Sequence, residues 1–367
     1  MKILNIVGAR PNFMKVAPLH RTFSSDNRID SKIIHTGQHF DAAMSEIFFN
    51  QLELPTPHYF LGVGSGTHSE VTARIMTSFE SVLLEEKPDL VLVVGDVTST
   101  LACSLVAVRN NIPVAHVEAG LRSYDRAMPE EVNRVLTDQI SDLLFITEKS
   151  AIENLEKENI SKSKIHFVGN CMIDSLVHYL PKADQSDILS HLHLLNKDYI
   201  VMTMHRPSNV DTNDGLLQII QLVERATENT KVVFPIHPRT KNKLMQFGLL
   251  DSLEKNSNLI ITEPLGYIEF IALLKNSKAV LTDSGGIQEE TTFLKVPCLT
   301  FRSSTERPIT VEVGTNILMN ELNTDITMEQ LKLILSGKVK VGHIPELWDG
   351  QAAQRIKGIL VSKFLNS

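Results

Sequence analysis

Short apolar runs that alternate with helix-like segments constrain the fold of this chain more than any other feature of its sequence. The runs are continuously apolar, as expected for strands that are buried on both faces of a parallel sheet. Segments with a helical apolar period, such as 68–85 and 215–227, supply the crossover connections that parallel strands require. The runs form one series at 2–7, 32–36, 90–94, 114–117, 143–147 and 165–168, and a second series at 199–204, 231–236, 259–262, 279–282, 298–301 and 317–319.

The two series predict two domains of the α/β class, each built on a doubly wound parallel sheet. Polar, poorly patterned sequence near 169–198 separates the series, and a length of 367 residues suits two domains of roughly 150 residues each. We therefore place an N-terminal domain at 1–170 and a C-terminal domain at 171–350. The helix-like stretch at 351–364 could pack on either domain.

The charge and the cysteine content exclude several classes of protein. Lys and Arg number 36 against 43 Asp and Glu, and the formal charge of −7 argues against nucleic acid or an anionic membrane as the main partner. No apolar run reaches the roughly 18 residues that span a bilayer, and Arg10 and Lys15 interrupt the start before a signal peptide could form.

The cysteines lack CxxC spacing and are expected to be buried, reduced thiols. We expect a soluble, cytoplasmic protein.

Functional groups in open α/β sheets gather at the carboxyl ends of the strands, and Gly8-Ala9-Arg10-Pro11 follows the first predicted strand. The glycine permits a tight turn into a helix whose N-terminus attracts an anion, and Arg10 and Lys15 add two cations there. Arg10 stands where a dinucleotide-binding fingerprint has its second glycine, which disfavours a NAD site. A pair of solvated cations on a first helical turn explains this segment equally well.

Three acidic residues of the first half, Asp96, Glu118 and Glu130, follow a strand or begin a helix. A carboxylate at the end of a buried strand is costly unless it is paired or lies in a cleft, which makes these residues candidates for acid–base chemistry. Helix capping is the simpler explanation for Asp96 taken alone, and a contact with the helix dipole is the simpler one for Glu130. These explanations account less well for Glu118, which ends an apolar strand between His116 and Arg122.

Two histidines follow successive strands in the second half of the chain. His205 precedes Arg206, and His237 precedes Pro238 and Arg239. Two such clusters at neighbouring strand ends predict a shared cleft with cationic and titratable character. Metal binding is the weaker alternative, because no cysteine or carboxylate lies at ligand spacing.

The most specific segment is 279–290, whose sequence AVLTDSGGIQEE predicts a strand, a tight turn at Ser284-Gly285-Gly286 and then a helix. Backbone N–H groups of the turn and the Ser284 hydroxyl would face a phosphate. Glu290 lies about one helical turn further on, where a carboxylate can accept both hydroxyls of a ribose. Arg307, after the next strand, adds a cation. A plain strand-to-helix turn is the alternative, but two phosphate-compatible turns in one chain favour nucleotide binding.

Ordered motifs along nearly the whole chain together resemble one known family. They are Gly8-Ala9-Arg10-Pro11, Gly37-Gln38-His39, Gly95-Asp96, 116–122 (HVEAGLR), 129–134 (PEEVNR), His205-Arg206, 283–290 (DSGGIQEE) and 305–308 (TERP). The chain resembles the non-hydrolysing UDP-N-acetylglucosamine 2-epimerases. This resemblance implies the GT-B fold, in which two Rossmann-like domains face each other across a cleft, with the final stretch 351–367 packed on the first domain.

The resemblance also implies an activity and a set of residues. The activity is reversible C2 epimerisation of UDP-N-acetylglucosamine to UDP-N-acetylmannosamine, by anti elimination of UDP and re-addition to a 2-acetamidoglucal intermediate. The implied catalytic residues are Asp96, Glu118, Glu130 and His205. The implied UDP-sugar-binding residues are Arg10, Lys15, Arg122, His237, Phe270 (near uracil), Ser284, Gly285, Gly286, Glu290 and Arg307. The region of Gln38 and His39 would bind an activating second UDP-sugar. A homodimer is implied, with no metal or other cofactor.

The chain departs from the family pattern in several places. Asn12 and Ser208 stand where many members have Glu, and Phe40 and Asp41 replace the usual Arg and Gln or Glu after Gln38-His39. These differences leave allosteric control open, and they leave open a related UDP-2-acetamido sugar as the substrate. A hydrolysing 2-epimerase, which releases UDP and N-acetylmannosamine, is a further alternative, as are a glycosyltransferase and a nucleotide-sugar sensor.

Overall fold

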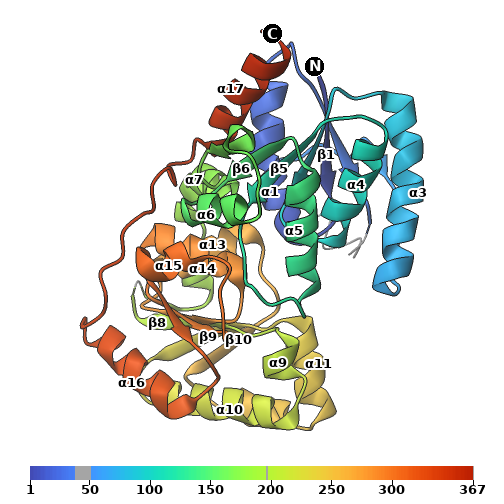
Figure 1. Cartoon of the computed structure of the whole chain (residues 1–367). Helices are drawn as coiled ribbons and strands as arrows, with labels where there is room; N and C mark the ends of the chain where they lie inside the picture. The colour runs from blue at the N-terminus through green and yellow to red at the C-terminus, as the bar shows by residue number, and fades with distance from the viewer. Residues whose placement is uncertain (38–50, 196, 367) are drawn as a thin grey trace. The chain divides into compact units, whose positions relative to one another are not determined.

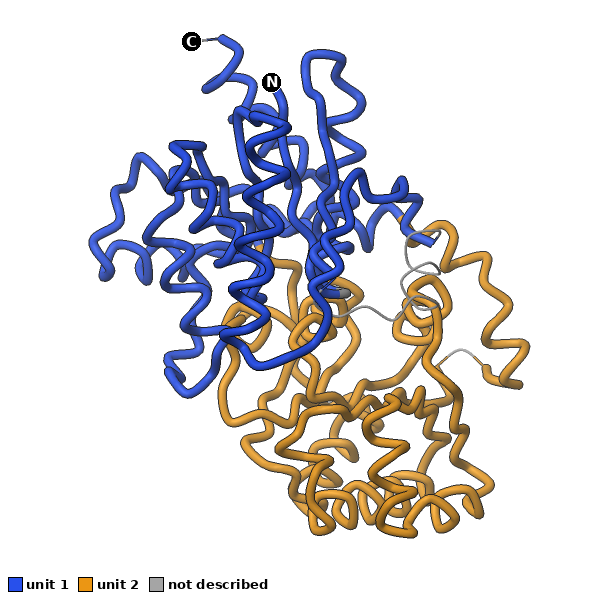
Figure 2. The backbone as a smooth tube through the Cα atoms, turned by 90° about the vertical axis from the view of Figure 1, so that its right-hand side faces the viewer, with its two compact units in different colours: residues 1–178, 346–367 blue, residues 179–345 orange. Residues whose placement is uncertain are grey.

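The computed structural model describes residues 1–37, 51–195 and 197–366, and the chain forms two compact units (Figure 1, Figure 2). The first unit comprises Met1–His178 and Glu346–Ser367, and the second comprises Tyr179–Pro345. The sequence analysis placed the boundaries after residues 170 and 350, whereas the units divide after residues 178 and 345. The first division falls inside helix α7, Cys171–Asp184.

A seven-stranded parallel sheet forms the centre of the first unit. Its order is β3-β2-β1-β4-β5-β6-β7, so the chain builds outward from β1 on one side and resumes at β4 on the other. The point between β1 and β4, where the direction changes, is where doubly wound sheets bind ligands. The strands are β1 Lys2–Val7, β2 Asp30–His35, β3 Tyr59–Phe60, β4 Leu90–Val94, β5 Val114–Ala119, β6 Leu143–Ile146 and β7 Ile165–Phe167.

A six-stranded parallel sheet forms the centre of the second unit, in the order β10-β9-β8-β11-β12-β13. Here the direction changes between β8 and β11, which pair in parallel. The residues that follow these two strands are therefore the first place to look for a ligand site. The strands are β8 Tyr199–Thr203, β9 Lys231–Pro235, β10 Leu259–Thr262, β11 Val280–Thr282, β12 Cys298–Phe301 and β13 Asn316–Met319.

Helices connect the strands and bury apolar faces in the cores. In α10, the Thr212 hydroxyl accepts a hydrogen bond from the N–H of Gly215 and caps the helix, and Leu216, Ile219 and Val223 recur at helical spacing in the core. Besides α7, the first unit contains α1 Arg10–Ser24, α3 His68–Glu86, α4 Thr98–Arg109, α5 Pro129–Ile140, α6 Ser150–Lys157, a 3₁₀ turn Lys162–Lys164 and α17 Ala352–Phe364. The second unit contains α8 Ile188–His191, α9 Pro207–Val210, α10 Asn213–Thr227, α11 Pro238–Gln246, α12 Leu250–Glu254, α13 Tyr267–Asn276, α14 Gly285–Leu294, α15 Pro308–Glu312 and α16 Thr324–Leu335.

The last segment of the chain returns to the first unit, where α17 packs on α1 (Figure 1). The indole N–H of Trp348 donates to the carbonyl of Thr147 at 3.0 Å. The buried carboxylate of Asp174 accepts the N–H groups of Ala352 and Ala353 at 3.0 and 2.7 Å, which caps α17. The C-terminal helix is thus an integral part of the first unit.

The strand pattern predicted from the sequence agrees closely with the structure. β1, β4, β10 and β12 have the predicted bounds, and the other predicted strands differ by at most two residues at either end. Tyr59–Phe60 was not predicted as a strand, because two residues at a sheet edge carry no periodicity. Within the described ranges, no helix is both long and apolar enough to cross a membrane.

Candidate active site

Lys15 on α1 and Glu118 on β5 form a buried ion pair at the carboxyl end of the first sheet. Nζ of Lys15 lies 2.7 Å from Oε2 of Glu118, and the two side chains are 6% and 4% exposed. The same ammonium lies 3.0 Å from the place that a Cβ on Gly95 would occupy. Because a buried carboxylate is costly without an opposite charge, Lys15 makes Glu118 tolerable at this position.

The backbone at Glu118 is unusual. Its φ angle is +73°, in the left-handed region, and the register between β5 and β6 shifts between Val117 and Ala119. A left-handed residue other than glycine costs on the order of 1–3 kcal/mol, and such residues are enriched at functional sites. A bulge of this kind changes the direction in which a side chain points, so the strain at Glu118 is consistent with a role in chemistry.

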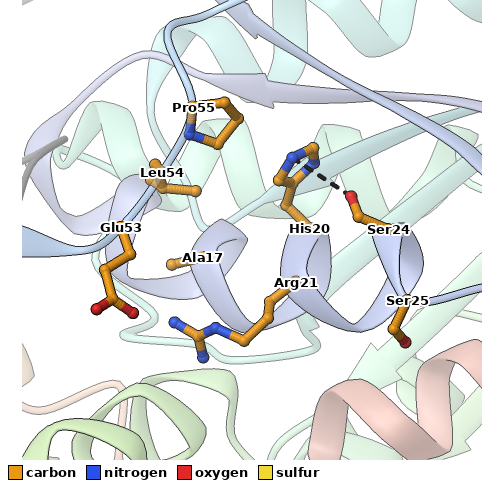
Figure 3. Close-up of a pocket in the computed structure, with 8 residues that line it drawn as sticks. All are labelled: Ala17, His20, Arg21, Ser24, Ser25, Glu53, Leu54 and Pro55. Carbon is orange, nitrogen blue, oxygen red and sulfur yellow. Dashed lines mark hydrogen bonds between the residues drawn. The ribbon is translucent and has the colours of Figure 1, made fainter.

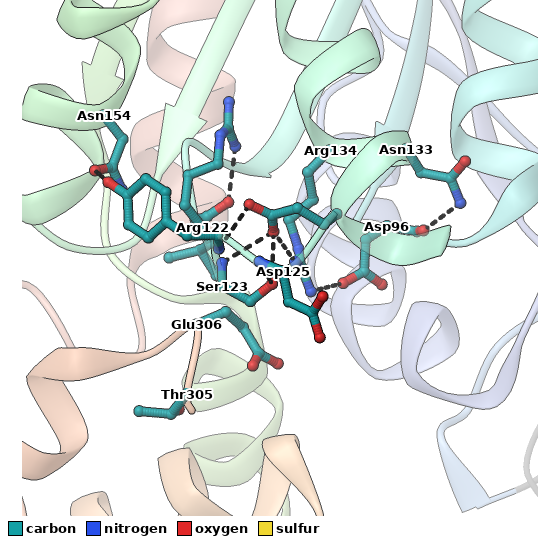
Figure 4. A network of polar contacts seen from close by, with 12 residues as sticks. Asp96, Arg122, Ser123, Asp125, Asn133, Arg134, Asn154, Thr305 and Glu306 are labelled. Carbon is teal, nitrogen blue, oxygen red and sulfur yellow. Dashed lines mark hydrogen bonds and ion pairs between the residues drawn. The ribbon is translucent and has the colours of Figure 1, made fainter. Parts of the chain in front are cut away.

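Asp96, just after β4, is held by two residues of α5 (Figure 4). Nη2 of Arg134 lies 2.6 Å from Oδ2 of Asp96, while its Nη1 lies 2.6 Å from Oε2 of Glu131. The side-chain amide of Asn133 donates to the backbone carbonyl of Asp96 at 2.8 Å. The Asp96 side chain keeps 22% exposure, so its carboxylate is fixed but accessible.

Glu130 and Glu131, adjacent in the first turn of α5, differ in their surroundings. Glu131 is buried and accepts three hydrogen bonds at 2.9 Å, from the N–H groups of Ser123 and Tyr124 and from the Ser123 hydroxyl. Burial alone would raise the pKa of Glu131, but these bonds and Arg134 hold it below its usual value. Glu130 is exposed. Glu131 therefore shapes the loop after β5, and Glu130 is the one accessible to a ligand.

Arg122 lies in a buried ion-pair network. Its Nη2 is 2.7 Å from Oδ2 of Asp138 and 2.7 Å from Oε2 of Glu158, and its Nη1 donates to the carbonyl of Leu121. Burial works against the charge of Arg122, but the hydrogen bond to Glu158 and the charge of Asp138 raise its pKa overall. These contacts fix the loop that follows β5, which gives Arg122 a supporting place in the predicted site.

Asn12 closes the turn after β1. Its Oδ1 accepts the N–H groups of Gly8 and Ala9, both at 3.0 Å, and its Nδ2 donates to the carbonyl of Val94 at 3.1 Å. The Asn12 side chain thus accepts and donates hydrogen bonds at the same time. Many members of the family have Glu at this position, and an ionised Glu can only accept. Asn12 ties the ends of β1 and β4 together at the switch point of the sheet.

His205 and Asp283 follow β8 and β11, at the switch point of the second sheet. Nδ1 of His205 lies 2.7 Å from Oδ1 of Asp283, whose carboxylate also accepts the N–H groups of His205 and Arg206 and the amide of Asn209. Burial would raise the pKa of Asp283, but the His205 contact and the backbone donors lower it overall. The His205 ring, 38% exposed, lies 5.3 Å from the His237 ring. Asp283 therefore orients His205 with Nε2 directed away from the carboxylate.

Ser284 immediately precedes α14, and its side chain makes no capping hydrogen bond. A Cβ on Gly285 would lie 3.1 Å from Nη1 of Arg307 and 3.4 Å from Nη1 of Arg302. A side chain at residue 285 would crowd Arg307, so glycine leaves room for the guanidinium groups near the start of the helix. An uncapped helix N-terminus beside two guanidinium groups is suited to a phosphate.

Glu306 and Glu289 hold the two buried arginines in place. Nη2 of Arg302 lies 2.7 Å from Oε2 of Glu306, and Arg307 pairs with the other oxygen of Glu306. Nε of Arg307 lies 2.9 Å from Oε1 of Glu289. Among the described residues, Nη1 of Arg302 has no hydrogen-bond acceptor. A buried guanidinium N–H without an acceptor points to an anion as its partner.

Glu290 is buried in α14, and burial raises its pKa to about 8. The charge of Glu289 adds to this shift, whereas a hydrogen bond with Tyr267 opposes it. Phe270, half-buried, stands one turn after Tyr267 on α13. The predicted ribose and uracil contacts thus belong to two helices of the second unit.

A cavity of about 730 Å³ lies along α1 in the first unit (Figure 3). His20, Arg21 and Glu53 are among its lining residues. Burial and the charge of His58 lower the pKa of His20 to about 4, so this ring is neutral near pH 7. Of the predicted site residues that the structure describes, none lines this cavity.

Some predictions fall outside what the structure describes. Gln38 and His39 lie outside the described residues, and so does the side chain of Arg10. Within the described parts of the chain, no group of three or more His, Cys, Asp or Glu side chains is arranged to hold a metal ion.

The sequence matches the family described as UDP-N-acetylglucosamine 2-epimerase over residues 21–361. The chain belongs to the UDP-N-acetylglucosamine 2-epimerase family. Within this family, the UDP-N-acetylglucosamine 2-epimerase of Methanocaldococcus jannaschii is 44% identical over 98% of this chain and 99% of its own. The UDP-2,3-diacetamido-2,3-dideoxy-D-glucuronate 2-epimerase of Pseudomonas aeruginosa is 41% identical over 97% of this chain and 98% of its own.

Solved structures agree with this membership of the 2-epimerase family. The crystal structure of the M. jannaschii enzyme in complex with UDP-GlcNAc and UDP aligns with a TM-score of 0.90 and 44% identity, covering 99% of this chain and 100% of that one. The lipopolysaccharide outer core galactosyltransferase WaaB aligns with a TM-score of 0.54 at 15% identity, a likeness that shows the fold alone. The family and the α/β fold of GT-B type predicted from the sequence are both confirmed.

The sequence patterns gave no role to several residues that build these candidate sites. Arg134 and Asp283 stand inside motifs that the sequence analysis quoted, but only the structure shows them paired with Asp96 and His205. Asp138 and Arg302 carry no local signal, because an isolated charge in a helix or after a strand is usually solvated. Their burial, at 1% and 6% exposure, is what reveals them.

Proposed function

We propose that this chain catalyses the reversible epimerisation of UDP-N-acetylglucosamine to UDP-N-acetylmannosamine at C2, by anti elimination of UDP and re-addition to a 2-acetamidoglucal intermediate. The observation that carries the proposal is the combination of two chemistries. Paired carboxylates stand at the strand ends of the first sheet, and an uncapped helix N-terminus stands beside two guanidinium groups in the second unit. The relative from M. jannaschii bears the name of this activity.

The second unit supplies what the leaving group needs. The C2 proton of an N-acetylated sugar is not acidic, and it becomes removable as the C1–O bond breaks and UDP departs with the electron pair. N–H groups of the turn at Ser284, together with Arg302 and Arg307, stabilise the diphosphate electrostatically. Glu290 accepts the ribose hydroxyls, and Phe270 contacts the uracil.

The first unit supplies the acid–base groups. A carboxylate among Asp96, Glu118 and Glu130 removes the C2 proton as the C1–C2 double bond forms, and another returns a proton to the opposite face when UDP adds back. Lys15 and Arg134 offset the charge of two of these carboxylates, which lowers their repulsion towards an anionic substrate. His205, oriented by Asp283, assists at the departing oxygen.

The related substrate UDP-2,3-diacetamido-2,3-dideoxy-D-glucuronate is a second candidate. The P. aeruginosa enzyme named for it matches nearly the whole chain at 41% identity, close to the 44% of the M. jannaschii enzyme. Parallel assays with the two UDP-sugars decide between them by the ratio of kcat/KM.

One experiment tests the reaction class. The protein is incubated with UDP-N-acetylglucosamine in deuterated water, and the products are followed by NMR. Deuterium at C2 of an intact UDP-sugar of both configurations is the expected result. Release of UDP with free N-acetylmannosamine would establish the hydrolysing reaction instead, and no turnover without an acceptor would favour a transferase or a sensor.

The homodimer and the activating second UDP-sugar belong to the same proposal. Light scattering of the purified protein measures the first. A sigmoidal dependence of rate on UDP-N-acetylglucosamine that disappears in His39→Ala would support the second.

A further inference from the structure

His116 and Asp138 form a buried pair that the proposed chemistry does not use directly. Both side chains are fully buried, and Nδ1 of His116 lies 2.6 Å from Oδ1 of Asp138. On the other side of the ring, Nε2 lies 2.8 Å from the carbonyl oxygen of Gly95. The pair therefore joins α5 to the ends of β4 and β5.

Both ring nitrogens of His116 face an oxygen atom. A carbonyl oxygen has no hydrogen to donate, so Nε2 of His116 is the donor to Gly95. Asp138 also faces the Arg122 guanidinium at 2.7 Å. His116 and this contact keep the pKa of Asp138 low despite its burial. Each ring nitrogen of His116 thus has an oxygen partner, one on Asp138 and one on Gly95.

The same network fixes the two backbone segments that carry the candidate acid–base residues. Oδ2 of Asp138 accepts the N–H of Gly120 at 3.0 Å, beyond the bulge at Glu118. His116 holds the Gly95 carbonyl, in the peptide that leads to Asp96. Gly95, Glu118 and Gly120 all have positive φ angles, a conformation that persists only where the surroundings enforce it.

We propose that His116 is a positioning residue, which acts with Asp138 to hold Asp96 and Glu118 in their reactive geometry. This role rests on the proposed epimerisation. Arg122 and Glu158 extend the buried network beyond Asp138.

Two substitutions of His116 separate the two bonds. His116→Gln keeps a donor near the place of Nε2 and retains the contact to Gly95, whereas His116→Asn keeps a donor towards Asp138 and loses Gly95. We expect kcat to fall roughly 10–100-fold in His116→Asn and less in His116→Gln, because small displacements of reacting groups have effects of this size. The affinity for UDP should stay within twofold, since its proposed contacts lie in the second unit. His20→Gln, at another buried and hydrogen-bonded histidine of the first unit, is the matched control and should keep the wild-type kcat.

A backbone measurement tests the network independently of turnover. The N–H of Gly120 donates to Asp138, so its hydrogen exchange should be faster in His116→Asn than in wild type and unchanged in His20→Gln. Unchanged exchange at Gly120 in His116→Asn, a kcat of that variant within twofold of wild type, or a parallel loss of UDP affinity would overturn the positioning role. If wild type binds UDP but shows no turnover, the proposed function fails, and the exchange at Gly120 still tests whether the pair holds the backbone.

Discussion

The two units share a doubly wound topology, but the charges at their strand ends are arranged in opposite ways. In the first unit, carboxylates stand at the strand ends and each meets a cation, as in the pairs of Lys15 with Glu118 and Arg134 with Asp96. In the second, guanidinium groups and the N-terminus of α14 stand at the strand ends, and Glu306 holds the guanidinium groups in place. The fold places both sets of charges at strand ends, and in the proposed function the partner of each charge decides whether that place transfers protons or binds an anion.

Replacing the buried carboxylate of Glu118 tests the proposed proton transfer in the first unit, and we expect the largest effect from this change. Glu118→Gln should lower turnover on the order of 10³-fold, because a positioned proton-transfer group is lost, while UDP binding measured by calorimetry persists. The variant also leaves Lys15 buried without its partner, so its thermal stability should fall. The double variant Lys15→Met/Glu118→Gln should regain stability but no turnover. Turnover of the single variant within tenfold of wild type would contradict a catalytic role.

A methyl group added to the turn at Ser284-Gly285-Gly286 tests the other half of the contrast, the binding of an anion by the second unit. Gly285→Ala places a methyl group 3.1 Å from Nη1 of Arg307 and from Oε1 of Glu306. Crowding of this kind costs about 1–3 kcal/mol, so UDP affinity should fall roughly 5–150-fold. Gly358→Ala in α17, where a methyl group meets nothing within 4 Å, is the control and should leave UDP affinity unchanged. Equal affinities for UDP in the two variants would show that the turn does not bind the diphosphate.

Removing one buried guanidinium tests whether the second unit recognises the phosphates. Arg302→Gln should weaken UDP about tenfold, because a charged hydrogen bond contributes roughly 1.5–3 kcal/mol, and should leave the affinity for uridine unchanged. Arg225→Gln, at an exposed pair with Asp325, serves as the control. A similar loss for uridine and UDP would indicate a general disturbance of the unit and not a phosphate contact.

The smallest expected effect is a pH dependence that arises in the second unit. Because the pKa of Glu290 is about 8 in the folded chain, the folded state keeps a proton there that the unfolded chain loses between roughly pH 4.5 and 8. The unfolding free energy should therefore fall as pH rises through this window, and this fall should be absent in Glu290→Gln. Denaturant titrations at several pH values measure it.

The same carboxyl group should link UDP binding to proton release. Ribose hydroxyls donate to the ionised form of Glu290, so affinity should rise a few-fold as pH approaches about 8. Calorimetry in buffers of different ionisation enthalpy detects the released proton. An affinity that is flat over this range would argue against Glu290 as the ribose contact.

The sequence predicted the sheets well and the site only in part, for a physical reason. Buried parallel strands must be apolar along their whole length. The first and last residues of β4 and β12 could therefore be predicted correctly from the sequence. Charged pairs obey no such local rule. Lys15 and Glu118 belong to α1 and β5, and Asp96 meets Arg134 of α5; these pairings depend on the fold and have no periodic signal.

Arg122 shows the opposite difficulty. Its motif placed it near the substrate, and only the structure shows its guanidinium between Asp138 and Glu158. His116, flagged only as a neighbour of Glu118, turns out to be hydrogen-bonded through both ring nitrogens. A motif indicates that a residue belongs to a site, but it does not distinguish contact from support.

The return of the chain to the first unit has a consequence for its synthesis. The second unit, Tyr179–Pro345, is inserted between two parts of the first. On the ribosome, Asp174 is made long before Ala352 and Ala353, whose N–H groups it binds. All of the second unit is therefore synthesised before Ala352–Phe364, and the surface of α1 that α17 covers stays uncovered until that segment has been made.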